Sequence, residues 1–97
     1  MPFKILYHED ALDDLEEIFD WSLDKHPEST SRFATEFFNH LDLAAAFPYI
    51  GLTVRSQSNV RRLIHSPLII YYRVDELRES IEILHVRHSS RRGRWIH

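Results

Sequence analysis

The sequence predicts a single α+β domain with the element order β-α-α-β-β-β, in which a helical hairpin packs on one face of a small antiparallel sheet. Three observations predict this class. The segments 8–25 and 28–46 carry apolar residues at three- and four-residue spacing, which is typical of amphipathic helices. The segments that follow residue 59 are rich in β-branched and aromatic residues, which favour strands. The length of 97 residues leaves room for one core, so residues 1–97 are expected to form one domain.

The first strand and the first helix are predicted near the N-terminus. Phe3–Tyr7 is a short β-type run that precedes acidic residues. The helix expected over 8–25 repeats apolar residues along one side, whereas carboxylates fill its other sides. Pro27 ends this helix, because the residue before a proline is disfavoured in the helical region.

The second helix is expected over 28–46, where apolar residues recur at helical spacing: Phe33, Phe37, Leu41 and Ala44. The hydroxyl residues 29–31 offer caps at its start. Residues 47–48 stop it, and Gly51 follows where a left-handed backbone conformation is expected. Because the connection between the helices is short, they should pack as an antiparallel hairpin.

Three strands are predicted in the second half of the chain, over 60–64, 68–74 and 81–87. Short turns at 65–67 and 75–79 connect them, so they should form an antiparallel meander. Strict alternation in the last strand divides its residues between two faces, with Ile81, Ile83 and His85 opposite Glu82, Leu84 and Val86. The core predicted between hairpin and sheet consists of Leu15, Phe19, Phe37, Leu41, Leu63, Ile70, Tyr72 and Ile83.

Composition excludes several classes of protein. Hydrophobic residues make up 43% of the chain and charged residues 28%, which is ordinary for a globular protein and excludes a disordered or collagen-like chain. The sequence has no cysteine, so disulfides and thiolate chemistry are excluded. It contains neither a signal-peptide pattern nor the run of about 18 apolar residues that a membrane span needs. A soluble, cytoplasmic protein is therefore expected.

Charge is distributed unevenly along the chain. Residues 1–50 carry three basic and eleven acidic side chains, whereas residues 51–97 carry nine arginines, no lysine and four acids. The basic half ends in a basic tail from about residue 89. Arginine binds phosphate and carboxylate groups through paired hydrogen bonds, so this half suggests a face directed at an anionic partner. Solvated surface charge explains the composition equally well.

Familiar metal-binding and catalytic motifs are absent. Seven histidines suggest a metal site, but none has the paired spacing of a zinc ligand set, and His85 and His88 should point to opposite faces of a strand. With only two glycines, Gly51 and Gly93, the chain has no phosphate-binding loop, and it has no nucleophile elbow. We therefore expect neither a metal nor a cofactor.

The remaining candidates for chemistry are arginines and histidines of the predicted sheet. Histidine can act as base or acid near neutral pH, and arginine can stabilise a phosphorane, so such a group can cleave RNA without a metal. The collection consists of Arg55, Arg61, Arg62, His65, Arg73, His85, Arg87, His88 and Arg91. The ribonuclease alternative that a family resemblance raises below would use Arg61, Arg62, His85, His88 and Arg91 of this collection. Local features favour the alternative, in which the basic residues of the sheet are exposed and pair with the acidic helix or with another chain.

Four segments follow one another at a characteristic spacing. They are Glu9–Ile18 with the continuation Phe19-Asp20-Trp21, Phe47-Pro48 followed by Gly51, Val60–Leu63 with Pro67–Asp75, and Ile81–His88 followed by Arg91. Together they resemble the RelE/ParE superfamily of type II toxin–antitoxin toxins, the plasmid stabilisation proteins, and most closely its ParE-like branch. The resemblance covers about residues 3–92 and implies the two-layer fold that the element order predicts independently.

The resemblance implies a growth-arresting toxin that a cognate antitoxin neutralises. In the family, the C-terminal segment of the antitoxin folds onto the toxin as a helix or an added strand, so a toxin–antitoxin hetero-oligomer is expected. ParE-like members inhibit DNA gyrase, here expected to occur by protein–protein contact, whereas RelE-like members cleave mRNA on the ribosome. The residues expected to contact the antitoxin or the target are Arg61, Arg62, Arg73, Arg87, Arg91 and Trp95.

Departures from the ribonuclease pattern favour the ParE-like branch. Ribonuclease members usually place a catalytic arginine early in the strand that corresponds to 68–74, where this chain has Leu68 and Ile69. They also tend to carry a tyrosine near the C-terminus, and this chain ends in Arg94–His97. A ParE-like gyrase inhibitor is therefore the leading hypothesis. A ribosome-dependent mRNA endoribonuclease is the alternative, and a non-toxic scaffold that binds an antitoxin is the third. The chain also departs from the ParE-like pattern, at Leu68, His85 and Arg87.

Overall fold

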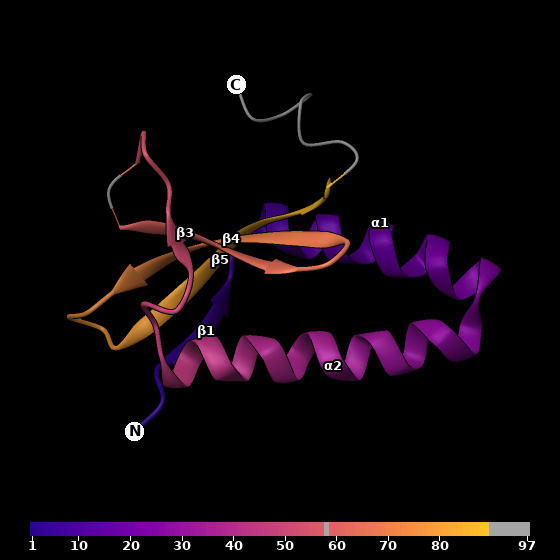
Figure 1. The fold of residues 1–97 in the computed structure, drawn as a ribbon, viewed down its shortest axis with the longest axis horizontal. Coiled ribbons are helices and arrows are strands. Elements are labelled where there is room, and N and C mark those ends of the chain that lie inside the picture. Colours follow the sequence, from indigo (N-terminus) through magenta and orange to yellow (C-terminus); the bar gives the residue numbers. More distant parts are fainter. Residues whose placement is uncertain (58, 90–97) are drawn as a thin grey trace.

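The computed structural model describes residues 1–57 and 59–89 and shows a helical hairpin packed on a five-stranded sheet (Figure 1). The elements are, in chain order, β1 (Lys4–Tyr7), α1 (Glu9–Lys25), α2 (Pro27–Ala46), β2 (Leu52–Thr53), β3 (Val60–His65), β4 (Leu68–Asp75) and β5 (Ser80–His88). The predicted α+β order is confirmed, and the short strand β2 is added to it.

The sheet has the strand order β1-β5-β4-β3-β2. Strands β3, β4 and β5 form the predicted antiparallel meander, β2 adds to β3 in antiparallel fashion, and β1 pairs with β5 in parallel. Pairing between β1 and β5 runs from Lys4 opposite Ser80 to Tyr7 opposite Ile83. Among the residues that the structure describes, no strand pairs with β5 on that side after Ile83, and α1 lies beside this part of β5 instead.

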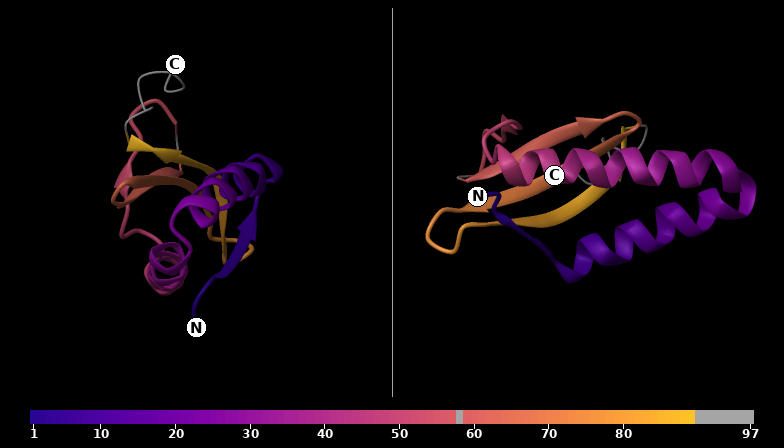
Figure 2. Two further views of the ribbon diagram at one scale, coloured as in Figure 1. Left: turned by 90° about the vertical axis from the view of Figure 1, so that its right-hand side faces the viewer. Right: turned by 90° about the horizontal axis from the view of Figure 1, so that it is seen from below.

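The two helices form the predicted antiparallel hairpin, and the closed end of this hairpin extends beyond the sheet (Figures 1 and 2). The predicted caps at residues 29–31 are wrong. His26 is the N-cap of α2 without a side-chain hydrogen bond, and Pro27 opens the helix because its missing N–H needs no partner there. Thr30 is buried instead, and its hydroxyl lies 2.5 Å from the Ser22 hydroxyl of α1, which joins the two helices near their turn.

The core lies between the hairpin and the sheet, as the sequence predicts. Phe37 of α2 is completely buried and packs edge-on against Phe19 of α1, with 5.8 Å between ring centroids. Phe19 itself is only partly buried at the margin of the cluster. The other predicted core residues are buried: Leu15, Leu41, Leu63, Ile70, Tyr72 and Ile83.

A β-bulge in β5 changes which residues face the helices. Tyr72 pairs with Ile83, but the preceding Tyr71 pairs with His85, so Leu84 is an extra residue on β5. The alternation is reversed beyond this point, and the buried residue is Val86. The prediction that His85 shares a face with Ile83 is therefore wrong.

Cross-strand pairing defines two faces of the sheet, because paired residues point the same way. The helix-facing side contains three rows across β3, β4 and β5: Arg61–Tyr72–Ile83, Leu63–Ile70–Val86 and His65–Leu68–His88. The opposite side, which we call the outer face, contains the rows Val60–Arg73–Glu82, Arg62–Tyr71–His85 and Ile64–Ile69–Arg87. His85 and His88 point to opposite faces, as the sequence predicts.

The expectation of a left-handed conformation at Gly51 is wrong, because no described glycine has a positive φ. Close packing requires a glycine at this position instead. The hydroxyl of Tyr72 donates to the Pro48 carbonyl at 2.7 Å and accepts from the Gly51 N–H at 3.0 Å. A Cβ on Gly51 would lie 2.8 Å from this hydroxyl and 2.8 Å from the Arg62 carbonyl oxygen. The loop after α2 is thus fixed on the sheet through Tyr72.

Candidate functional site

The structure divides the sequence-predicted site residues between the two faces of the sheet. Arg62, Arg73, His85 and Arg87 lie on the outer face, and Arg61 and His88 lie on the helix-facing side. The RNA-cleavage candidates are therefore not brought together, because Arg61 and His88 are separated from Arg62 and His85 by the sheet itself. Arg91 and Trp95 lie outside the described residues.

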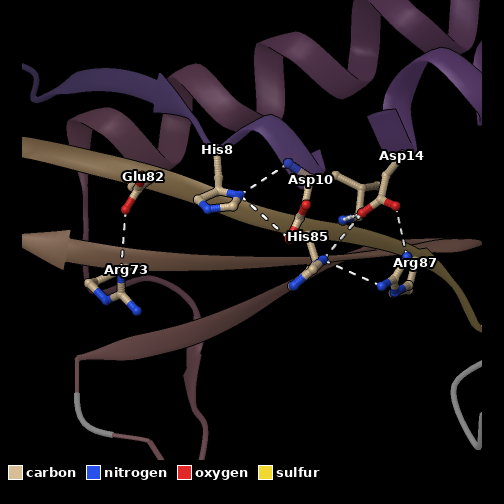
Figure 3. A network of polar contacts seen from close by, with 8 residues as sticks. His8, Asp10, Asp14, Arg73, Glu82, His85 and Arg87 are labelled. Carbon is tan, nitrogen blue, oxygen red and sulfur yellow. Dashed lines mark hydrogen bonds and ion pairs between the residues drawn. The ribbon is translucent and has the colours of Figure 1, made fainter. Parts of the chain in front are cut away.

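Asp14 of α1 connects the helix to the edge of β5 (Figure 3). Its Oδ2 accepts a hydrogen bond from the Val86 N–H at 3.0 Å, at the edge that β1 leaves unpaired. Its Oδ1 accepts from the Arg87 guanidinium at 2.7 Å, and Oδ2 lies 3.5 Å from Nδ1 of His85. The Asp14 side chain is only 14% exposed, so these contacts are shielded from water. The bulge makes this arrangement possible, since it points His85 and Arg87 to the outer face.

Two further carboxylates lie on the same face, near Arg73 and His8 (Figure 3). Glu82 is 3.3 Å from the Arg73 guanidinium, and this pair is more exposed than the Asp14 pair, so it contributes about 0–1 kcal/mol to stability. Nδ1 of His8 caps α1 by accepting a hydrogen bond from the Asp10 N–H at 3.0 Å, and the Asp10 carboxylate lies 3.6 Å from the same nitrogen. Both carboxylates reduce the positive potential of the face.

A depression of about 260 Å³ lies among these groups. It is lined by His8, Asp10, Gln57, Arg73, Leu84 and His85, and the bulged Leu84 supplies the apolar part. Two imidazoles, one guanidinium and one carboxylate line the depression, so it is suited to contact with the polar surface of another protein. Within residues 1–57 and 59–89 no three histidine, aspartate or glutamate side chains are arranged to hold a metal ion.

Arg61 supports the loop after α2. Its guanidinium donates to the Gly51 carbonyl at 2.7 Å and to the Tyr49 carbonyl at 3.2 Å, and it lies 4.9 Å from the centroid of the Tyr49 ring. Tyr49 in turn donates a hydrogen bond to the Glu76 carboxylate in the β4–β5 turn. Burial raises the pKa of the adjacent Tyr72 phenol, which keeps that hydroxyl protonated as a donor.

Sequence reasoning overlooked Asp14, although it expected the arginines of the sheet to pair with the acidic helix or with another chain. Pairing with the acidic helix is confirmed for Arg87. The sequence nevertheless contains a feature that could have identified Asp14. The buried residues of α1 are Ala11 and Leu15, and Asp14 lies three residues after one and directly before the other. A carboxylate on this inner stripe of a helix requires a cationic or N–H partner from the packed sheet.

Comparison with known proteins identifies the family. The sequence profile described as "ParE toxin of type II toxin-antitoxin system, parDE" matches residues 5–93. The chain belongs to this ParE toxin family. No curated protein matches the sequence.

Solved structures share the fold of this ParE-family chain at low sequence identity. The chromosomal ParDE system of P. aeruginosa contains a chain with a TM-score of 0.71 and 20% identity, covering 89% of this chain and 95% of that one. The RelBE2 toxin–antitoxin complex of Mycobacterium tuberculosis gives a TM-score of 0.63 at 19% identity, covering 91% and 99% of the two chains. The archaeal RelE–RelB complex of Pyrococcus horikoshii gives 0.55 at 16%, covering 94% and 99%.

The α+β fold of this ParE-family chain, with two helices on a mostly antiparallel sheet, is therefore shared by chains of these solved toxin–antitoxin systems. Among the described residues, neither helix is long and apolar enough to cross a membrane.

Proposed function

We propose that this type II toxin arrests bacterial growth by binding DNA gyrase through protein–protein contact. The observation that supports this choice over RNA cleavage is the Asp14 carboxylate, which holds Arg87 and lies beside His85 on the outer face. Membership of the ParE family favours the same target, because the ParE-like branch is the gyrase-directed one.

Cleavage of RNA at neutral pH needs a base, an acid and a cation around one phosphate. A phosphate bound at the candidate His85 would come close to the Asp14 carboxylate, which lies 3.5 Å from Nδ1 of this residue, and such a like-charge contact costs roughly 1–4 kcal/mol depending on the local dielectric. The early positions of β4 carry Leu68 and Ile69, which are buried and supply no cation. The outer face carries carboxylates beside its basic side chains. Such mixed charge suits contact with a protein surface better than contact with an RNA backbone, which is uniformly negative.

We also propose a cognate antitoxin as the partner that neutralises the toxin in a hetero-oligomer. The matched structures from P. aeruginosa, M. tuberculosis and P. horikoshii come from toxin–antitoxin systems, which supports such a partner. Arg62 is exposed on the outer face and is well placed for ionic contacts. Arg73 is also exposed there, and its pair with Glu82 is open to water and can be exchanged for a carboxylate of the partner. Arg61 is less suitable, because its guanidinium already binds the loop at Gly51.

Induction of the toxin in bacteria, followed by two measurements on the same cells, distinguishes the hypotheses. We expect growth arrest, relaxed or cleaved plasmid DNA, and unchanged mRNA 5′ ends. The variants His85→Ala and His88→Ala should remain toxic at matched levels of folded protein, because inhibition by protein–protein contact needs no imidazole as acid or base. New mRNA 5′ ends with normal DNA supercoiling would favour the ribonuclease alternative. Unimpaired growth would favour the non-toxic scaffold.

A further inference from the structure

His40 of α2 and His65 of β3 meet at the boundary between the helical hairpin and the sheet. Their Nδ1 atoms are 2.8 Å apart and their ring centroids 5.0 Å apart. Both residues are half-buried. His65 ends β3 directly before the turn to β4, so this contact joins the closed end of the β3–β4 hairpin to α2.

The ring of His65 is also part of the aromatic cluster of the hairpin. It packs edge-on against Phe33, with 5.1 Å between centroids, and against Phe37, with 5.8 Å. Phe37 is completely buried in the core. A movement of His65 away from α2 would therefore expose the aromatic cluster at this end of the molecule.

A hydrogen bond between two Nδ1 atoms requires one protonated and one unprotonated nitrogen. One imidazole donates its Nδ1–H, and the other accepts with a bare Nδ1. If both imidazoles were charged, two N–H groups and two positive charges would face each other. Burial, and to a smaller extent the neighbouring His65, lower the pKa of His40, in agreement with this conflict.

Few charged groups surround the pair. Glu36 lies one turn before His40 on α2, and His88 of β5 shares the row His65–Leu68–His88, in which β4 contributes the apolar Leu68. Arg61 lies at the other end of β3, where its guanidinium binds the Gly51 carbonyl. The nearest ring of α1 in the aromatic cluster is Phe19, which packs on Phe37. Across the described parts of the chain, neither His40 nor His65 forms an ion pair with a carboxylate that would stabilise a second proton.

We propose that the His40–His65 pair is a proton-operated latch that holds the β3–β4 hairpin on α2. The latch is closed while one proton lies between the two Nδ1 atoms. When both imidazoles are protonated, the hydrogen bond is lost, the two cations repel each other, and the end of β3 separates from α2. Acid pH thus loosens the toxin at one defined place, the aromatic cluster beside His65.

Nitrogen-15 NMR of the histidine side chains in the full chain tests the latch. At about pH 7.5 we expect a protonated Nδ1 on one residue of the pair and a bare Nδ1 on the other. On acidification the pair should lose its shared hydrogen bond in a distinct step, because two imidazoles that share one Nδ1 proton take up protons as a pair. The ring signals of Phe33 and Phe37 should shift with this step. Two independent titrations at the ordinary pKa of histidine, with unmoved aromatic signals, would overturn the proposal.

Stability measurements with matched variants give a second test. The unprotonated pair stabilises the fold above the ordinary histidine pKa, and this stability is lost as the pH falls. Between about pH 7.5 and pH 5 the unfolding equilibrium constant should rise several-fold more for the native chain than for His40→Gln, because glutamine can bond His65 in either protonation state.

The control variant is His26→Gln, which changes an exposed histidine whose side chain makes no cap hydrogen bond to α2. It should keep the pH dependence of the native chain. An equal pH dependence in all three proteins would overturn the latch. If His40→Gln does not fold, the NMR titration of the native chain decides alone.

Discussion

Replacing Asp14 by alanine should destabilise the fold, because this carboxylate joins α1 to the edge of β5. It accepts the Val86 N–H at 3.0 Å and the Arg87 guanidinium at 2.7 Å. Asp14→Ala would leave that N–H at a covered sheet edge without its acceptor, and it would remove the carboxylate that the Arg87 guanidinium contacts at 2.7 Å.

The magnitude follows from the burial of the two partners. An unsatisfied buried N–H costs about 1–3 kcal/mol. The Arg87 side chain is 29% exposed, so water partly replaces its lost partner, and the loss stays below the roughly 3–5 kcal/mol of a fully buried pair. Together these effects predict a loss of about 2–4 kcal/mol in the free energy of unfolding.

Urea denaturation of the purified chain measures this loss, with Asp13→Ala as the control. Asp13 is the neighbouring residue of α1 and is exposed, so its replacement should change the free energy of unfolding by less than about 0.5 kcal/mol. Asp14→Asn separates the two effects, because its amide oxygen still accepts the Val86 N–H. If Asp14→Ala lowers the free energy of unfolding no more than Asp13→Ala does, the Asp14 carboxylate does not hold α1 on β5.

Three other changes test the core, the loop and the antitoxin contact. Phe37→Ala removes a fully buried ring and should cost about 3–5 kcal/mol in thermal or urea unfolding, whereas a change within about 0.5 kcal/mol would place Phe37 outside the core. Tyr72→Phe removes the hydroxyl between Pro48 and Gly51 and should cost about 1–3 kcal/mol, and a neutral result would show that the loop is held by other contacts. Arg62→Glu should slow antitoxin association and flatten its salt dependence in stopped-flow mixing, and rates unchanged across a salt series would exclude an ionic role.

The periodicity of the sequence predicts the helices and the main strands because each repeats over several turns or residue pairs. The 28–46 pattern leads directly to α2, and the β-branched run at 68–74 leads to β4. The two residues of β2 carry no such pattern, because their strand conformation comes from pairing with Arg61 and Arg62 of β3. Tertiary contacts create this strand, so local sequence cannot reveal it.

The candidate site was harder to predict than the fold, since it depends on one inserted residue. Leu84 is an ordinary strand residue in the sequence, yet its bulge turns His85 to the outer face and Val86 into the core. The alternation of apolar and polar residues in a strand does not indicate where an extra residue reverses the two faces. Asp14 is likewise one carboxylate among many on α1, and its role becomes evident only when the edge of β5 lies beside it.

Supercoiling of relaxed plasmid DNA by purified gyrase, with the folded toxin added in increasing amounts, is the sharpest test of the proposed target. Intact mRNA on translating ribosomes is followed in parallel at the same toxin concentrations. We predict that supercoiling declines as the toxin approaches the concentration of gyrase, that antitoxin restores it, and that the mRNA stays uncut. Undiminished supercoiling together with cleaved mRNA would contradict the assignment and identify the toxin as a ribonuclease.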